Sequence, residues 1–172
     1  LLQPLSEPCR TARFEHARVD GYAPSDLDAL AAAGEVVWCG VEPLAEHDGR
    51  LALYLADAMP RLHVPVSAPG DLSPREASVL ALLAARGASF FADVHAATGG
   101  GFPRETVDAL WRLVWRGLVT NDGFAALRAY LAPAPRRAAR RRLPARGRAF
   151  RSRRDSPPAA EGRWSLVERR AG

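Results

Sequence analysis

The sequence predicts an α+β fold made of small modules that combine helices with β-hairpins, followed by a disordered, arginine-rich linker. Three observations carry this prediction. Apolar residues recur at helical spacing in several segments, and short β-prone runs stand between them. Ser73, Pro74 and Glu76 form a helix start signal, with a cap, a proline in the first turn and a capping-box acid. Positions 136–154 hold ten arginines and no acid, and no apolar period runs through them.

The first predicted module covers residues 21–66 and consists of a short helix and a β-hairpin. Ser25, with Asp28 three positions later, resembles a capping box and is expected to begin the helix. The β-prone runs around Trp38 and Tyr54 are separated by a turn-rich stretch, which is typical of a hairpin. A helix followed by a hairpin is the second half of a winged helix, so we expect a winged-helix-like module here.

The second predicted module covers residues 72–132. Its capped first helix is expected to end at Gly87, and a run of three glycines separates the next two helices. Three helices with a short turn between the second and third predict a helix-turn-helix core, and hence a second winged-helix-like module. The expected elements are helices at 74–86, 90–97, 103–116 and 124–131 and a strand at 118–120, with Asn121 or Asp122 capping the last helix.

Three further segments complete the predicted organisation. Residues 1–20 are expected to be the end of a preceding module, residues 133–161 a basic linker, and residues 162–172 the start of a β-rich module. Within the last segment, 163–167 is expected to be a strand that finds no partner in the chain. Because the chain begins with Leu1 rather than Met, we interpret it as a piece of a longer cytoplasmic protein.

Composition excludes two classes of enzyme mechanism. All 24 basic residues are arginine, so the sequence holds no lysine. A P-loop needs a lysine at the β- and γ-phosphates, and a Schiff-base enzyme needs a lysine amine. A codon bias towards arginine explains this replacement, but it does not explain where the arginines cluster.

Charge is distributed unevenly along the chain. Residues 1–135 hold 11 arginines against 16 acids, a net charge of −5, whereas residues 136–172 hold 13 arginines against 3 acids, a net charge of +10. An acidic folded part that carries a basic segment indicates a polyanionic partner. The longest apolar runs are far too short to cross a membrane, so we expect no membrane partner.

Several phrases resemble the C-terminal half of the large helicase-related (Lhr) family of bacterial superfamily-2 helicases. In the family's order they are GYAPSDLDALAAAGEVVWCG (Gly21–Gly40), DGRLALYLAD (48–57), LSPREASVLALLAARGASFFADV (Leu72–Val94), ALWRLVWRGLVTNDGFAALRAYL (Ala109–Leu131) and GRWSLV (Gly162–Val167). The resemblance implies a place beyond the two RecA-like motor domains, among winged-helix modules and before a β-rich module. It also implies that the ATPase motifs, with ATP and Mg, belong to the parent chain and that this fragment holds no cofactor.

Two groups of arginines are candidates for nucleic-acid binding, since a guanidinium can contact two phosphate oxygens at once. The arginine-rich tract is interpreted as a weak nucleic-acid contact rather than an inert linker. The helix at 103–116 carries acids as well as bases, which favours packing between domains over reading of the DNA groove. The candidates are Arg104, Arg112 and Arg116 on this helix and Arg136, Arg137, Arg140, Arg141, Arg142, Arg146 and Arg148 in the tract.

No catalytic or metal site is expected. The four histidines and the two cysteines, Cys9 and Cys39, share no metal-ligand spacing, and no CxxC pair occurs. The C-terminal half of the resembled family is similar to winged-helix DNA glycosylases, which use a glutamine-containing motif. The single glutamine here, Gln3, stands outside any such pattern. A base-flipping pocket needs polar groups that read the base and activate water, so we do not expect base excision in this segment.

The sequence therefore predicts a non-catalytic DNA-binding or scaffolding fragment of an ATP-dependent DNA helicase with a repair role, located in the cytoplasm. The expected partners are DNA, single-stranded or duplex, together with the motor domains and the β-rich module of the same parent chain. Two alternatives stay open at this point. One is a winged-helix transcriptional regulator acting alone, and the other is a purely structural module between domains.

Overall fold

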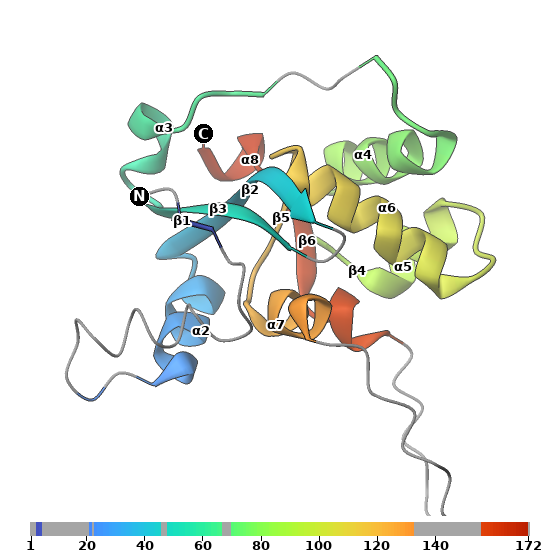
Figure 1. Ribbon diagram of the computed structural model, residues 1–172. Helices are drawn as coiled ribbons and strands as arrows, with labels where there is room; N and C mark the ends of the chain where they lie inside the picture. The colour runs from blue at the N-terminus through green and yellow to red at the C-terminus, as the bar shows by residue number, and fades with distance from the viewer. Residues whose placement is uncertain are drawn as a thin grey trace, which may run out of the picture.

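The computed structural model of the chain describes residues 3–4, 21, 23–45, 48–66, 70–132 and 156–171. The first part contains β1 (Gln3–Pro4), α2 (Pro24–Ala33), β2 (Val36–Ala45), β3 (Asp48–Leu55) and α3 (Met59–Leu62). The three strands form an antiparallel sheet in the order β1-β3-β2 (Figure 1). The expected helix and hairpin of the first module are confirmed. Residues 3–4 were expected in a preceding module, but they join this sheet instead.

The second part forms a separate three-stranded sheet with helices packed on it. Its elements are α4 (Pro74–Arg86), β4 (Ser89–Phe90), α5 (Phe91–Ala97), α6 (Pro103–Trp115), β5 (Val119–Asn121), α7 (Ala125–Leu131), the 3-10 turn η1 (Pro158–Ala160), β6 (Arg163–Leu166) and α8 (Glu168–Ala171). The strand order is β4-β6-β5, and both neighbours run antiparallel to β6. The described residues therefore have an α+β fold, as the sequence predicts.

Local signals place α4 as expected. The backbone N–H of Glu76 donates to Ser73 Oγ at 3.3 Å, and the backbone N–H of Ser73 donates to Glu76 Oε2 at 2.8 Å. These two bonds make the predicted capping box, and each satisfies an N–H group that the helix itself leaves without a partner. Gly87 ends the helix with a φ of 79°, a conformation that glycine adopts without strain.

The predicted helix caps, Ser25 for the first helix and Asn121 or Asp122 for the last, are wrong. Helix α2 begins two residues earlier, with Ala23 as the N-cap, and the carboxylate of Asp26 accepts the Ala23 N–H at 2.8 Å. Asp28 lies on α2, but its Oδ1 accepts the backbone N–H of Phe124, the N-cap of α7, at 3.1 Å. The first turn of α7 is thus capped from a helix that lies far away in sequence.

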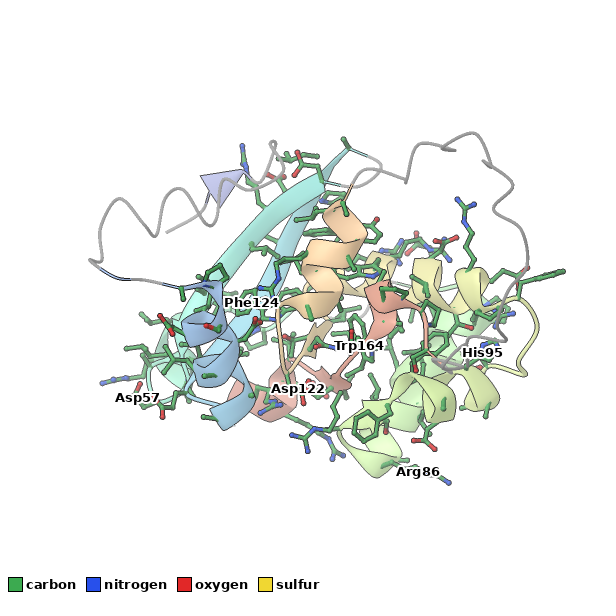
Figure 2. The ribbon with its side chains drawn as sticks, turned by 90° about the horizontal axis from the view of Figure 1, so that it is seen from below. Asp57, Arg86, His95, Asp122, Phe124 and Trp164 are labelled. Carbon is green, nitrogen blue, oxygen red and sulfur yellow. The ribbon has the colours of Figure 1, made fainter. Side chains whose placement is uncertain are left out.

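The expectation that residues 163–167 lack a partner and begin a following β-rich module is wrong, because β6 pairs with two strands of the second sheet. Trp164 lies opposite Ser89 of β4 and Asn121 of β5, so β6 is the central strand of the second sheet. The Trp164 side chain is wholly buried and lies near the middle of the molecule (Figure 2). Sequence patterns missed this pairing because the partners lie more than 40 residues away along the chain.

The predicted linker, 133–161, also ends differently from the expectation. Its last residues form η1, which packs against α7, and Ala160 is buried. The indole N–H of Trp111 donates to the carbonyl oxygen of Ala159 at 2.8 Å. Residues 133–155 lie outside the described residues. The tract thus connects two elements of one packed unit rather than two separate domains.

The two predicted modules share one hydrophobic core. Trp38 of β2 is fully buried and stacks on Trp111 of α6, with ring centroids 6.2 Å apart. The hydroxyl of Thr120 on β5 donates to the backbone oxygen of Trp38 at 2.5 Å. Gly40 of β2 approaches α6 so closely that a Cβ there would stand 2.1 Å from the carbonyl oxygen of Val114. Only glycine permits this approach, so the hairpin and α6 form one packed body.

Candidate nucleic-acid interface

Helix α6 and its C-cap residue, Arg116, present the first group of predicted nucleic-acid ligands. Each of these arginines has a carboxylate partner. Arg104 Nε lies 3.8 Å from Asp108 Oδ2 one turn later on the same helix. Arg116 Nη2 lies 3.3 Å from Asp71 Oδ2. Arg112 Nε lies 2.6 Å from Glu76 Oε1 on α4. These pairs offset the positive charge that a phosphate would otherwise meet on this helix.

Burial separates the three arginines further. Arg104 is 83% exposed and its ion pair is long, so its guanidinium is the one most able to reach a phosphate. Arg112 is about half exposed, but its partner Glu76 is 3% exposed, which ties the guanidinium to the interior. Arg116 is 34% exposed, and its Nη1 is buried without a hydrogen-bond partner in the described structure. The structure does not gather the three guanidinium groups into one site.

The electrostatics of Glu76 favour a structural role for Arg112. Burial raises the pKa of the Glu76 carboxyl, but hydrogen bonds from Arg112 and Ser73 and the charge of Arg112 lower it more. The net pKa lies below the usual value, so the carboxylate stays ionised at neutral pH. A buried carboxylate needs such a partner, because an isolated buried charge is strongly disfavoured.

The opposite face of α6 is a core face. Trp111 is 1% exposed and Trp115 is 5% exposed, and their ring centroids lie 5.8 Å apart. Trp115 also packs on the hairpin at Gly49, where a Cβ would come within 2.5 Å of its ring. The two tryptophans therefore pack a core, and their rings are not free to stack on bases.

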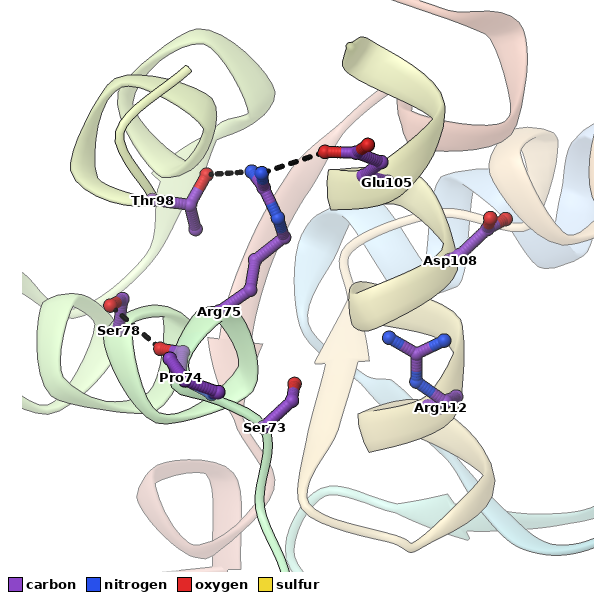
Figure 3. Close-up of a pocket in the computed structure, with 8 residues that line it drawn as sticks. All are labelled: Ser73, Pro74, Arg75, Ser78, Thr98, Glu105, Asp108 and Arg112. Atoms are coloured by element: carbon purple, nitrogen blue, oxygen red, sulfur yellow. Dashed lines mark hydrogen bonds and ion pairs between the residues drawn. The ribbon is translucent and has the colours of Figure 1, made fainter. Parts of the chain in front are cut away.

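Arg75 was missed by the sequence reasoning, although it organises the turn before α6. Its Nη1 donates to Thr98 Oγ1 at 2.9 Å, to the Gly100 carbonyl oxygen at 3.0 Å and to Thr106 Oγ1 at 3.0 Å. Its Nη2 contacts Glu105 Oε2 at 2.8 Å, and the side chain points from α4 towards this turn (Figure 3). Arg75 thereby fixes α4, the glycine turn and the start of α6 relative to one another. Spacing along the chain gave no signal for this network.

A cleft of about 480 Å³ lies between the start of α4 and the outer face of α6. Ser73, Arg75, Glu105, Asp108 and Arg112 are among the residues that line it. Two cations and two carboxylates leave the lining without a dominant charge. The cleft therefore lacks the uniform positive field that attracts a nucleic-acid backbone.

The second group of predicted ligands lies outside the described residues. It comprises Arg136, Arg137, Arg140, Arg141, Arg142, Arg146 and Arg148. The described chain stops at residue 132, just after α7 ends at Leu131, and resumes at residue 156, just before η1 begins at Pro158. These two elements pack against each other. The tract therefore leaves and rejoins the folded body at adjacent places.

Two arginines near the C-terminus lie at the ends of helices. A guanidinium nitrogen of Arg169 donates to the Ala84 carbonyl oxygen in the last turn of α4. Arg170 Nε donates to Ser165 Oγ at 3.3 Å, and Arg170 Nη1 reaches within 3.8 Å of the place of a Cβ at Gly34, which ends α2. The C-terminal end of a helix carries a partial negative charge that favours cations. Both arginines thus have structural roles.

Two other reactive side chains in the described part of the chain, Cys39 and His95, have structural surroundings. Cys39 is buried, and desolvation raises the pKa of its thiol to about 12, so it is not a nucleophile at neutral pH. His95 stacks on Phe91, and its Nδ1 lies 2.9 Å from Thr106 Oγ1. No cluster of three or more metal-ligating residues occurs among the described residues. None of the described helices is long and apolar enough to span a bilayer.

Comparison with known proteins identifies the family. A family model described as "Large helicase-related protein, winged-helix domain" matches residues 16–56. A Mycolicibacterium smegmatis protein named "Lhr helicase/ probable uracil glycosylase" is 37% identical over 159 residues, which cover 87% of this chain and 10% of that protein. The chain belongs to the large helicase-related family. An Escherichia coli protein named "Lhr helicase/uracil glycosylase" is 35% identical over 168 residues, 88% of this chain and 11% of that protein.

The family match agrees with the structure of the first module. The matched residues take in α2, β2 and the whole of β3, and the match starts before the predicted boundary at residue 21. The chain spans about a tenth of the length of the curated relatives it matches. The matched regions are 10% of the M. smegmatis protein and 11% of the E. coli protein. It is thus similar to a winged-helix region within much longer helicase-related proteins.

Proposed function

We propose that this chain is a non-catalytic DNA-binding and scaffolding part of a longer ATP-dependent DNA helicase that acts in DNA repair. Similarity to relatives named helicases supports the parent activity. The observation that carries the DNA-binding role is the arginine tract, with ten arginines and no acid at positions 136–154. A polyanion gains affinity from such a tract because condensed counterions are released on contact.

We also infer that the chain holds tandem winged helices. Elements α4, β4, α5, α6, β5 and β6 follow the order helix, strand, helix, helix, strand, strand, and the last strand lies between the other two. The segment that joins the last two strands of such a unit is its wing. In this interpretation α7 belongs to the wing, and the arginine tract, which lies in the same connection along the sequence, supplies the nucleic-acid-binding residues.

In this proposal, ATP hydrolysis and DNA binding belong to different domains of the parent protein. ATP and Mg act in motor domains elsewhere in the chain, and those domains and a β-rich module are partners of this region. The parent works in the cytoplasm, without a membrane partner. Both relatives carry "uracil glycosylase" in their names, but we assign no base excision to this segment, whose single glutamine is Gln3.

Replacement of the ten tract arginines by serine tests the proposal. Equal length keeps the connection between α7 and η1, so the folded body is left intact. Fluorescence anisotropy with labelled single-stranded and duplex DNA measures affinity at low salt. We expect the replacement to lower affinity for both DNAs at least tenfold, and the Arg104→Gln variant to lower it less than threefold. Equal affinity of the tract variant and the unaltered chain would refute the role of the tract.

One observation favours a purely structural module as the second candidate. The arginines of α6 and its C-cap, Arg116, all lie within ion-pair distance of a carboxylate, and the cleft beside this helix has mixed charge. A structural module would show no DNA affinity even at low salt. Sequence-specific binding at nanomolar affinity by this chain alone would instead support a stand-alone transcriptional regulator.

A further inference from the structure

Strand β6 is the element on which the second sheet depends. Both ladders of this sheet involve it, because β4 and β5 pair with β6 and not with each other. Strands β4 and β5 contain only two and three residues. Without β6 the body would therefore offer two short strands that face a gap.

The side chains of the C-terminal segment fill this gap with apolar surface. Trp164 is 0% exposed, Leu166 6% and Val167 1%, and Ala160 just before the strand is 1% exposed. Trp164 meets Trp111 edge to face, with ring centroids 5.7 Å apart. Burial of this size is the main source of binding free energy between protein surfaces.

Directional hydrogen bonds from the body fix the register of the segment. The Asp122 carboxylate accepts two hydrogen bonds from Arg163, one from the backbone N–H at 2.8 Å and one from the side-chain Nε–H at 2.7 Å. Asn121 Nδ2 donates to the carbonyl oxygen of Glu161 at 3.0 Å. The indole N–H of Trp111 binds the segment at a third place, before the strand begins. These donors and acceptors recognise both the backbone and one arginine of the segment.

We propose that the described residues between 21 and 132 form a binding groove for the segment 156–171, and that the groove holds this segment without help from the covalent connection. The recognised chemistry is an extended strand with tryptophan and leucine two positions apart on its inner face and an arginine that meets Asp122. The groove works by strand addition, in which backbone hydrogen bonds give affinity and side-chain pockets give specificity. The arginine tract is then an insertion within a folded unit, and it can be cut without loss of the fold. This proposal does not depend on nucleic-acid binding.

Cleavage of the full chain tests the proposal. A recognition sequence for a site-specific protease is inserted between Leu143 and Pro144, and the folded chain is cut there. We expect the two pieces to elute together with the mass of one uncut chain by light scattering, and to separate only in denaturant. Near-ultraviolet circular dichroism should be unchanged. Release of the C-terminal piece in native buffer would overturn the proposal, and so would a mass of two copies, which would indicate strand exchange between molecules.

Substitutions in the cut chain test the recognised chemistry. Asp122→Asn keeps the size of the side chain but weakens the contact with the Arg163 guanidinium, and we expect association of the pieces to weaken about tenfold. Trp164→Ala should weaken it at least a hundredfold, because a large cavity replaces a buried ring. Glu161→Gln is the matched control and should leave association unchanged, since the Glu161 side chain is exposed. Equal association of all three variants would overturn the assigned groove.

Discussion

The ion pair between Arg112 and Glu76 separates a structural role for α6 from a DNA-reading role. The perturbation is Arg112→Met, which keeps the apolar stem of the side chain and removes the guanidinium. Glu76 then loses the contact that lies 2.6 Å away, while the capping bonds with Ser73 remain. A hydrogen bond between charged groups contributes about 1.5–3 kcal/mol. Because the Arg112 side chain is half exposed, we expect a smaller loss, of about 1–2 kcal/mol at neutral pH.

The loss of stability caused by Arg112→Met should depend on pH. The folded-state pKa of Glu76 lies below its unfolded value, so the ionised carboxylate stabilises the fold above the unfolded pKa. This contribution disappears as the pH falls through the lowered folded-state pKa. Arg112→Met removes the hydrogen bond and the positive charge of Arg112, which are two of the causes that lower this pKa. The stability difference between the unaltered chain and the variant should therefore be full at pH 7 and shrink below about pH 4.

Urea unfolding monitored by tryptophan fluorescence measures this difference, since the core contains Trp38, Trp111, Trp115 and Trp164. Arg104→Met is the matched control on the same helix. Its side chain is 83% exposed and its ion pair is 3.8 Å long, so we expect a change within about 0.5 kcal/mol. Equal stability of the Arg112 variant and the unaltered chain at pH 7, together with a large loss of DNA affinity, would refute the structural assignment.

Three further predictions follow from the packing. Gly40→Ala places a methyl group 2.1 Å from a carbonyl oxygen of α6 and should destabilise the fold by about 1–3 kcal/mol in urea unfolding, whereas Gly70→Ala, which meets nothing within 4 Å, should change little. In a Cys9→Ser background, the Cys39 thiol should react with a disulfide reagent at the rate of unfolding, and fast reaction in the folded protein would contradict its burial. Arg169→Gln should lower the melting temperature by a few degrees, because it removes a cation from the end of α4.

Elements that depend on neighbouring residues could be predicted from the sequence. The capping box of α4 joins Ser73 to Glu76, which are three positions apart, so its signal lies in a short stretch of sequence. The hairpin of β2 and β3 is equally local, and the apolar face of α6 follows from helical spacing. The family resemblance was likewise carried by contiguous phrases, and it is confirmed by the relatives.

Contacts between distant segments could not be predicted in this way. The cap of α7 comes from Asp28, nearly a hundred residues earlier in the chain, and no pattern near Phe124 indicates it. Strand β6 pairs with β4 across more than 70 residues of chain. Its sequence alone therefore resembles the first strand of a following β-rich module. The carboxylate partners of Arg112 and Arg116 lie on α4 and in the segment before it. Residue types on α6 therefore gave candidate ligands but not their neutralising partners.

The salt dependence of DNA affinity shows whether the arginine tract neutralises phosphates. The logarithm of the affinity falls with the logarithm of the salt concentration, with a slope of roughly −0.9 for each duplex phosphate that is neutralised. For the unaltered chain we expect a steep slope that corresponds to several phosphates. With the ten tract arginines replaced by serine, the slope should approach zero, whereas Arg104→Gln should change it by less than one phosphate. A slope that survives replacement of the tract but falls in the Arg104 variant would show that α6, and not the tract, contacts the phosphates.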